Sequence, residues 1–185
     1  IALRELCHKQ GVTLYTVLLA AYSASLIAAT QRQEVTICTP MVNRMLPEVQ
    51  NLIGYFNTIV PLRLSIQDQP TYVELIQHTQ QIIQAAYTHQ DVVYEQLADI
   101  SPAVRRTLSH VLLVLQDATE QSLNLFEAKL SPLELYAGQA SFDCFITIMD
   151  HNATLSIVAE YKSERYRSET IQALLQAYTD TIEHM

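Results

Sequence analysis

The chain has 185 residues, of which 49% are hydrophobic, so it can bury one sizeable core and suits a single folded domain over residues 1–185. Its formal net charge is −8, from 19 acidic and 11 basic residues, and it contains no run of Lys or Arg. Binding to a phosphate backbone therefore has no electrostatic basis, and we expect no nucleic-acid partner.

The longest apolar stretch indicates a buried helix rather than a membrane span. It runs from Leu14 to Ala29, contains three Ser or Thr residues, and is shorter than the ~20 residues that a bilayer requires. No basic segment followed by a cleavage site is visible, so we expect a cytoplasmic protein without a membrane partner. Cys7, Cys38 and Cys144 are far apart and lack metal-ligand spacing, which predicts reduced thiols and no metal site.

The first part of the chain predicts two helices and a strand. Apolar residues recur at helical spacing over Leu3–Gln10, and Gly11 is suited to end that helix. A second helix, Thr13–Ala29, begins at a residue type that caps helix N-termini. The β-branched segment Glu34–Thr39 predicts a strand that ends before Pro40, because proline cannot donate a ladder hydrogen bond.

The middle of the chain adds two strands and two helices. A strand is expected over about Ile59–Leu64. In the predicted helix Thr71–Thr88, the first residue and Glu74 form a capping-box pattern, and apolar residues fall on one face. A short helix over Val93–Asp99 then precedes a buried strand over His110–Gln116.

The last part predicts a hairpin and a terminal helix. Residues Ala118–Gln139 show no clean period, which indicates an irregular excursion. The strand-like runs Phe142–Met149 and Thr154–Tyr161 flank a four-residue loop, as in a hairpin. The segment Ser168–His184 predicts a helix capped by its first residue, with one apolar stripe. This order describes an α/β fold, a mixed β-sheet covered by helices.

The residues alone reveal no catalytic centre. Three glycines spread over the chain cannot build a Gly-rich phosphate loop. His89, near Asp91, has a neighbouring carboxylate that could orient it as a general base, and local hydrogen bonding is the alternative. Asp143 lies in a strand-like run, where a buried carboxylate requires a partner such as an Arg, and lining a substrate channel is the alternative.

Several segments match the motifs of one enzyme family. The segment "CTPMVNR" resembles a strand that ends in GTPxxNR, with Thr39, Pro40, Asn43 and Arg44 in matching positions. The segment "NLIGYFNTIVPLRL" is similar to IGxFVNTLPLR, and its matching residues are Ile53, Gly54, Phe56, Pro61, Leu62 and Arg63. Because "NTI" replaces "VNT", Thr58 rather than Asn57 takes the position of the motif's Asn.

Two later segments continue the resemblance. "HQDVVYEQL" is similar to HQDxPFExL, and its matching residues are His89, Gln90, Asp91, Glu95 and Leu97. "SFDCFITIMD" resembles KFDLTLSL, in which Asp143 matches, and the last strand and helix follow as expected. In this order and spacing the segments resemble the C-terminal half of condensation domains from nonribosomal peptide synthetases, over nearly the whole chain.

The resemblance implies one lobe of a chloramphenicol-acetyltransferase-like fold. Residues at the substrate tunnel or lobe junction would be Gly54, Tyr55, Phe56, Asn57, Thr58 and Arg63. Structural motif residues would be Pro40, Asn43, Arg44, His89, Gln90, Asp91, Glu95 and Asp143. At the junction, Gly54 would permit a positive φ or a close backbone approach, and Phe56 would fill the space between lobes. No catalytic residue is expected, because the family's HHxxxDG motif belongs to the N-terminal lobe and has no match in this sequence.

The implied activity is amide-bond formation between substrates held as thioesters on the phosphopantetheine arms of carrier domains. The implied partners are the N-terminal lobe and the carrier domains, with self-association through an exposed lobe junction, and no cofactor bound directly. Two alternatives remain: a degenerate module that only docks a carrier or another partner, and a lobe of a related acyltransferase that uses coenzyme A. The isolated chain is expected to be inactive.

Overall fold

The computed structural model describes residues 2–44, 46–66, 70–90, 92, 94–102, 104–105, 110–117, 138 and 140–185. Within them a five-stranded sheet has the order β2-β1-β3-β4-β5. Its strands are β1 (Glu34–Val42), β2 (Asn57–Ser65), β3 (Val111–Asp117), β4 (Cys144–Asp150) and β5 (Leu155–Tyr161). The β1–β2 and β4–β5 pairs are antiparallel, whereas β1–β3 and β3–β4 are parallel. The predicted mixed sheet and the predicted hairpin are confirmed.

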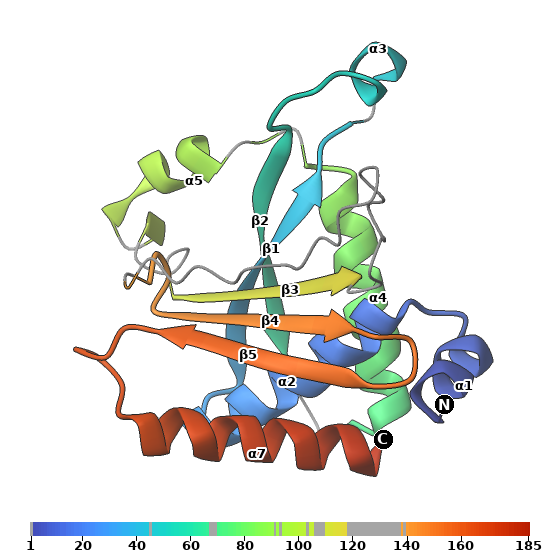
Figure 1. Ribbon diagram of the computed structural model, residues 1–185, viewed down its shortest axis with the longest axis vertical. Coiled ribbons are helices and arrows are strands. Elements are labelled where there is room, and N and C mark those ends of the chain that lie inside the picture. The colour runs from blue at the N-terminus through green and yellow to red at the C-terminus, as the bar shows by residue number, and fades with distance from the viewer. Residues whose placement is uncertain are drawn as a thin grey trace, which may run out of the picture.

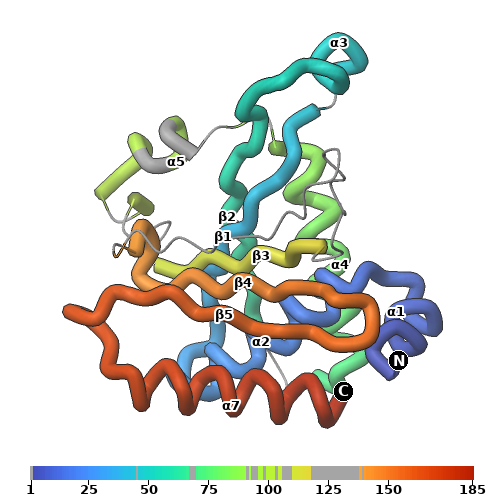
Figure 2. The backbone as a smooth tube through the Cα atoms, in the orientation of Figure 1, coloured from blue at the N-terminus to red at the C-terminus, as the bar shows by residue number. Residues whose placement is uncertain are grey.

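The helices are α1 (Ala2–Gln10), α2 (Leu14–Thr30), α3 (Pro47–Gln50), α4 (Tyr72–Tyr87), α5 (Tyr94–Ile100) and α7 (Ser168–His184). Of these, α2, α4 and α7 contribute to the main core on one face of the sheet, and α5 packs against the opposite face. Helix α2 lies between α4 and α7 and packs on β1 (Figure 1). The short helix α3 was not predicted. It lies within the β1–β2 connection, at the part that projects farthest from the sheet and its helices (Figure 2). The irregular excursion expected over Ala118–Gln139 falls outside the described residues, except for Gly138.

Local capping by side chains explains where α2 and α4 begin. Thr13 caps α2, and its hydroxyl oxygen accepts a hydrogen bond of 3.2 Å from the backbone N–H three residues on. Thr71 and Glu74 form the predicted capping box of α4, with both reciprocal bonds present. The predicted bounds of α7 are confirmed, but Ser168 is not its cap, because Arg167 occupies the N-cap position without a side-chain cap bond and Ser168 is already helical.

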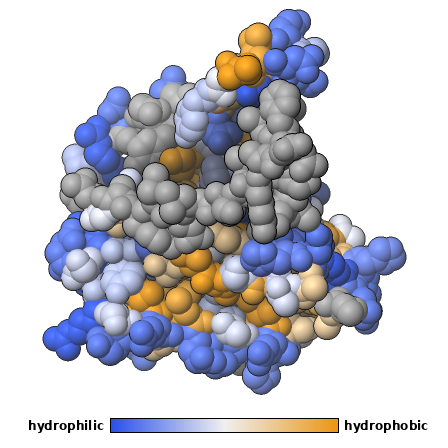
Figure 3. Space-filling model, in the orientation of Figure 1, coloured by the Kyte–Doolittle hydropathy of each residue, from blue (hydrophilic) through white to orange (hydrophobic). Residues whose placement is uncertain are grey.

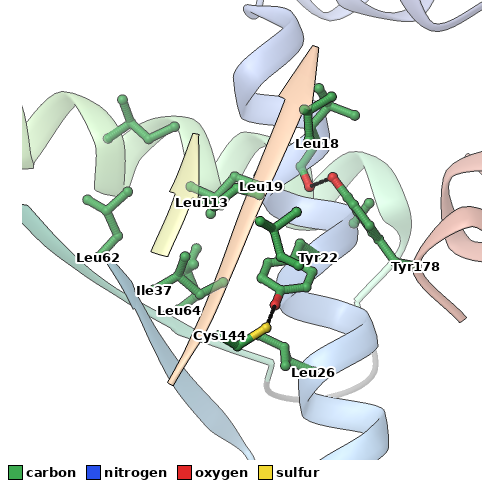
Figure 4. Close-up of a cluster of buried hydrophobic side chains, with 14 of the residues drawn as sticks. Leu18, Leu19, Tyr22, Leu26, Ile37, Leu62, Leu64, Leu113, Cys144 and Tyr178 are labelled. Atoms are coloured by element: carbon green, nitrogen blue, oxygen red, sulfur yellow. Dashed lines mark hydrogen bonds between the residues drawn. The ribbon is translucent and has the colours of Figure 1, made fainter. Parts of the chain in front are cut away.

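The main core lies between the helices and the sheet (Figure 4). Tyr22 of α2 and Tyr178 of α7 are fully buried, and their rings lie 5.1 Å apart between centroids. The Tyr178 hydroxyl donates to the carbonyl of Leu18 at 3.0 Å, and burial raises the pKa of that phenol far above its usual value. The predicted stripe of α7 therefore faces the core, although Leu175 is only half-buried.

The strand β1 continues through its proline, contrary to expectation. Pro40 pairs with Ile59, and Cys38 pairs with Pro61, two positions away in the same antiparallel register. Pairs two positions apart are of the same type, and proline cannot donate, so both are non-hydrogen-bonded pairs. The nitrogen atoms of both prolines point away from the β1–β2 interface, which lets the ladder run on to Val42.

A smaller cluster lies on the opposite face of the sheet. Cys38 and Leu112 are its buried members, and Leu97 of α5 packs against them. Burial raises the pKa of the Cys38 thiol to about 12. All three cysteines of the chain are buried and form no disulfide, as predicted.

In the described part of the chain, no single helix is long and apolar enough to cross a bilayer, although α1 and α2 together, bent by 103°, meet the length and composition criteria.

Candidate functional site

The connection between β1 and β2 forms a protruding surface, here called the tip (residues 42–44 and 46–56). It carries several of the most exposed large hydrophobic side chains in the described residues. These are Val42, Leu46, Leu52, Ile53 and Tyr55. Ile53 is 105% exposed and Tyr55 is 82% exposed. Figure 3 shows this apolar group on the projecting end of the molecule, beside the polar residues of α3.

Arg44 organises the tip from within. Its guanidinium donates hydrogen bonds to the carbonyl oxygens of Val49, Leu52 at 2.8 Å and Gly54 at 3.2 Å, with a longer one to Gln50. The same group lies over the ring of Phe56, 4.2 Å from its centroid. The sequence places Arg44 among the structural motif residues. Its hydrogen bonds to several carbonyl oxygens could not be predicted, because they cross a loop that has no local sequence pattern.

Of the two reasons expected for a glycine at position 54, a positive φ and a close approach, the structure shows the close approach. Gly54 is not among the described glycines with a positive φ, so the left-handed conformation is not the reason for a glycine here. A Cβ atom built on Gly54 would lie 3.0 Å from Cε2 of Phe56, which is tighter than ordinary contacts. The close approach is therefore to the ring that Arg44 also contacts. Phe56 itself is half-buried by this packing.

The remaining candidate residues for the lobe junction lie along β2, at two different ends of the strand. Asn57 and Thr58 are ladder residues opposite Val42 and Met41, next to the tip. Arg63 lies toward the other end of β2 and forms an exposed ion pair with Glu34. The structure thus brings Gly54, Tyr55, Phe56, Asn57 and Thr58 together, with Asn43 and Arg44 beside them, but it places Arg63 apart from this group.

The segment after α4 holds the other predicted motif. The backbone N–H of His89 donates to the carbonyl of Ala86, which continues the end of the helix. Gln90 is 3% exposed, and its side-chain oxygen has no hydrogen-bond partner among the residues that the structure describes. Asp91 lies outside the described residues and the side chain of Glu95 is not described, so the acid–base hypothesis for His89 stays a prediction.

Asp143 has the cationic partner that the sequence predicts. This carboxylate is 1% exposed and accepts bonds from Arg165 at 2.6 Å, from Lys162 at 3.1 Å and from the Nδ1 side of His110. Burial pushes the pKa of Asp143 upward, but the hydrogen bonds from His110 and Lys162, with the charge of Arg165, outweigh it and lower the pKa. The cluster joins the start of β3, the start of β4 and the turn before α7.

Neither of two open grooves on the described surface includes the tip. One groove lies between α1, the β4–β5 turn and the end of α7, and the other between α2, the start of β1 and α7. Among the described residues, no group of three His, Cys, Asp or Glu side chains could hold a metal ion. The tip is thus an exposed apolar protrusion outside both grooves.

Comparison with known proteins identifies the family. The family model described as "Condensation domain" matches residues 1–185. The chain belongs to the condensation-domain family. It is 28% identical over 185 residues to tyrocidine synthase 3 of Brevibacillus parabrevis, covering 97% of this chain and 3% of that protein. It is 29% identical over 175 residues to malpinin synthetase of Mortierella alpina, covering 92% of this chain and 2% of that protein. The condensation-domain chain thus spans a small part of the length of these relatives.

Solved condensation domains share the fold. The condensation domain of the monacolin K polyketide synthase MokA superposes with a TM-score of 0.82 at 19% identity, covering 97% of this chain and 43% of that chain. The first condensation domain of the CDA synthetase gives a TM-score of 0.75 at 14% identity, covering 98% of this chain and 41% of that chain. The α/β fold expected from the sequence is therefore the condensation-domain fold.

Proposed function

We propose that this chain is the C-terminal lobe of a condensation domain that forms an amide bond between two carrier-bound substrates. One observation carries the proposal: the family model matches the entire chain, while the chain covers only 41–43% of two solved condensation-domain chains. A chain that matches its family throughout and yet fills less than half of that fold corresponds to one lobe.

The reaction defines what a lobe must contribute. An amine nitrogen attacks the thioester carbonyl carbon, the carbon–nitrogen bond forms, the carbon–sulfur bond breaks, and the thiol leaves with a proton. Both reactants arrive on phosphopantetheine arms, which are substrates here rather than a bound cofactor. A positioned group must lie within hydrogen-bond reach of the amine, and we assign that group to the N-terminal lobe.

In this proposal the lobe supplies a tunnel wall and a surface for carrier domains. Gly54, Tyr55, Phe56, Asn57 and Thr58 would lie at the lobe junction, because they form one continuous segment that leads from the tip into β2. Arg63 would contribute further along the same strand. A cytoplasmic location completes the proposal and is supported by the three buried cysteines, which form no disulfide and suit a reducing compartment.

The test compares this purified chain with an intact condensation domain that contains it. Each is mixed with aminoacyl- and peptidyl-loaded carrier proteins, and the condensed product is followed by mass spectrometry. We expect product from the intact domain and none above the uncatalysed background from the chain alone. Product from the chain alone would overturn the assignment of the catalytic group to another lobe.

Two other outcomes of the assay select the alternatives. Intact protein that binds loaded carriers but yields no product would indicate a docking module. Intact protein that accepts acyl groups from free coenzyme A would indicate a coenzyme A-dependent acyltransferase.

A further inference from the structure

The first residues of β1 and β3 diverge and leave a groove between them. Within the described residues these strands pair only at Cys38 and Leu112, so the segments on either side of this contact make no further ladder pairs. The groove beside the start of β1, bounded by α2 and α7 and here called the wedge groove, has a volume of about 1330 Å³. Its apolar lining includes Tyr22, Leu26, Val35, Val111, Cys144, Ile171 and Leu174. Figure 4 shows three of these, Tyr22, Leu26 and Cys144, lying close together.

A buried carboxylate orients one polar side chain at this groove. His110 lines the groove, and its side chain is 42% exposed. The Nδ1 atom of this imidazole bonds to the carboxylate of Asp143, which is almost completely buried. Lys162 and Arg165 donate to the same carboxylate and hold it in place. The ring of His110 is therefore anchored through one nitrogen and exposed on the other side.

The bond to Asp143 decides which ring nitrogen can bind another group. A carboxylate accepts hydrogen bonds, so in the neutral ring the proton lies on Nδ1 and Nε2 keeps its lone pair. The side chain of His110 makes no other hydrogen bond with the described residues. Nε2 is therefore an unused acceptor beside an apolar surface. A ligand that covered this surface would have to supply a donor to Nε2, because burying an unpaired polar atom is costly.

The charges that line the groove favour a neutral ligand. Arg32 and Glu169 have opposite signs, and the carboxylate of Glu34 is already paired with Arg63. A charged ligand would thus be attracted by one lining residue and repelled by another. An anion would, in addition, offer no hydrogen-bond donor to the neutral imidazole of His110.

We propose that the wedge groove binds a small, neutral, apolar ligand with one hydroxyl group, which donates its hydrogen bond to Nε2 of His110. Phenol is the simplest aromatic member of this class. Asp143 acts as a positioning residue, because it fixes the ring and the nitrogen that carries the proton. The site does not rest on the proposed function. It adjoins the start of β1, whereas the tip follows the end of that strand.

Titration with phenol and anisole tests the proposal. Both probes have one aromatic ring, but in anisole a methyl group replaces the hydroxyl hydrogen, so it cannot donate. The methyl signals of Leu26 and Val111 are followed by NMR in the intact condensation domain at about pH 8. We expect a Kd on the order of 1 mM for phenol and about 5-fold weaker binding of anisole. An apolar groove without an acceptor would instead prefer anisole, because of its additional methyl group.

Substitutions at His110 separate the acceptor from the shape of the groove. His110→Phe keeps an aromatic ring but removes the acceptor, so the preference for phenol should disappear. His110→Gln retains an accepting oxygen and should keep part of the preference. His78→Phe, on the exposed side of α4 and outside the groove, is the matched control and should bind both probes as the unsubstituted domain does.

Nitrogen NMR of isotope-labelled histidine rings adds a test that does not depend on the folding of a variant. In the unsubstituted domain at about pH 8, we expect Nε2 of His110 to be unprotonated and its signal to shift with phenol but not with anisole. The signal is identified by its loss in His110→Gln. A protonated Nε2, equal affinities for the two probes, or a preference for phenol that survives in His110→Phe would each overturn the proposal.

Discussion

The core beneath α2 and the tip beyond β1 both contain large apolar residues, but the core buries them and the tip exposes them. In the core, Leu18 and Tyr178 are fully buried, and the Tyr178 hydroxyl donates a hydrogen bond to the Leu18 carbonyl. At the tip, Ile53 and Tyr55 face outward, while the carbonyl oxygens of Leu52 and Gly54 accept hydrogen bonds from Arg44. The apolar residues of the core are thus packed against one another, whereas those of the tip are exposed. A substitution in one of these two regions should therefore leave the packing of the other unchanged.

The largest expected loss of stability comes from the core. Tyr178→Ala removes a fully buried ring and its hydrogen bond to Leu18, so the free energy of unfolding should fall by about 3–5 kcal/mol. Denaturant titration measures the change. Leu175→Ala, at a half-buried site on the same helix, is the control and should cost clearly less. Equal losses at both sites would show that the two positions are packed alike.

Removing the charge of Asp143 should cost about 2 kcal/mol. Asp143→Asn keeps the size of the side chain but leaves Lys162 and Arg165 without a carboxylate, and these partially exposed cations can rehydrate. Chemical denaturation at neutral pH measures the loss. Asp180→Asn, on the exposed face of α7, is the control and should be close to neutral. A neutral effect of Asp143→Asn would mean that hydrogen bonds, rather than charge, hold the cluster.

Acid should act through the same cluster. The folded pKa of Asp143 is lowered, so its contribution is fully present above its unfolded pKa of about 4 and is lost as the pH falls through the folded value. Denaturation from pH 6 down to pH 3 should therefore bring the stability of Asp143→Asn closer to that of the unsubstituted chain. A constant gap between the two proteins across this range would contradict the lowered pKa.

Gly54→Val should cost about 1 kcal/mol, and its effect should stay at the tip. The new Cβ would meet the ring of Phe56 at 3.0 Å and displace it from Arg44. Hydrogen exchange would detect faster opening of residues 46–56 with no change in α2 or α7. Gly54→Ala should produce a weaker version of the same response. Faster exchange throughout the core would show that the tip and the core are not independent.

The smallest change in stability is expected at the most exposed residue. Ile53→Ser should alter the unfolding free energy of this chain by less than about 0.5 kcal/mol, because the side chain makes no buried contacts to lose. In an intact domain the same substitution should be clearly destabilising if the tip is buried there. Thermal unfolding measures the change in stability in both proteins. An equal change in both would show that the tip is no more buried in the intact domain than in this chain.

Local signals explain which elements could be predicted from the sequence. The cap at Thr13 and the box at Thr71 and Glu74 depend on residues within one helical turn, and both are confirmed. The partner of Asp143 was also predicted, because a carboxylate in an apolar strand requires a cation. Its identity was not, since Lys162 and Arg165 reach it only once β4 and β5 are paired.

The features that the sequence judged wrongly or left undecided depend on register and on contacts between residues far apart in the chain. Pro40 reads as a strand terminator, but in this register its missing N–H is on the side away from β2. Arg44 matches a family motif, yet its four carbonyl partners lie up to ten residues away along a loop without periodicity. Gly54 was given two possible reasons, and the contact with Phe56 decides between them.

The register of the two prolines also affects how this sheet behaves toward other chains. Within the described residues, β2 is the last strand on its side of the sheet, so the outer row of its backbone groups has no neighbouring strand there and resembles the edges that pair with other molecules. Pro61 points its nitrogen toward that row, which therefore lacks a donor at the centre of the strand. The charged Arg63 follows two residues later. The edge is thereby protected against the edge-to-edge pairing that starts aggregation, even while the apolar tip beside it stays uncovered.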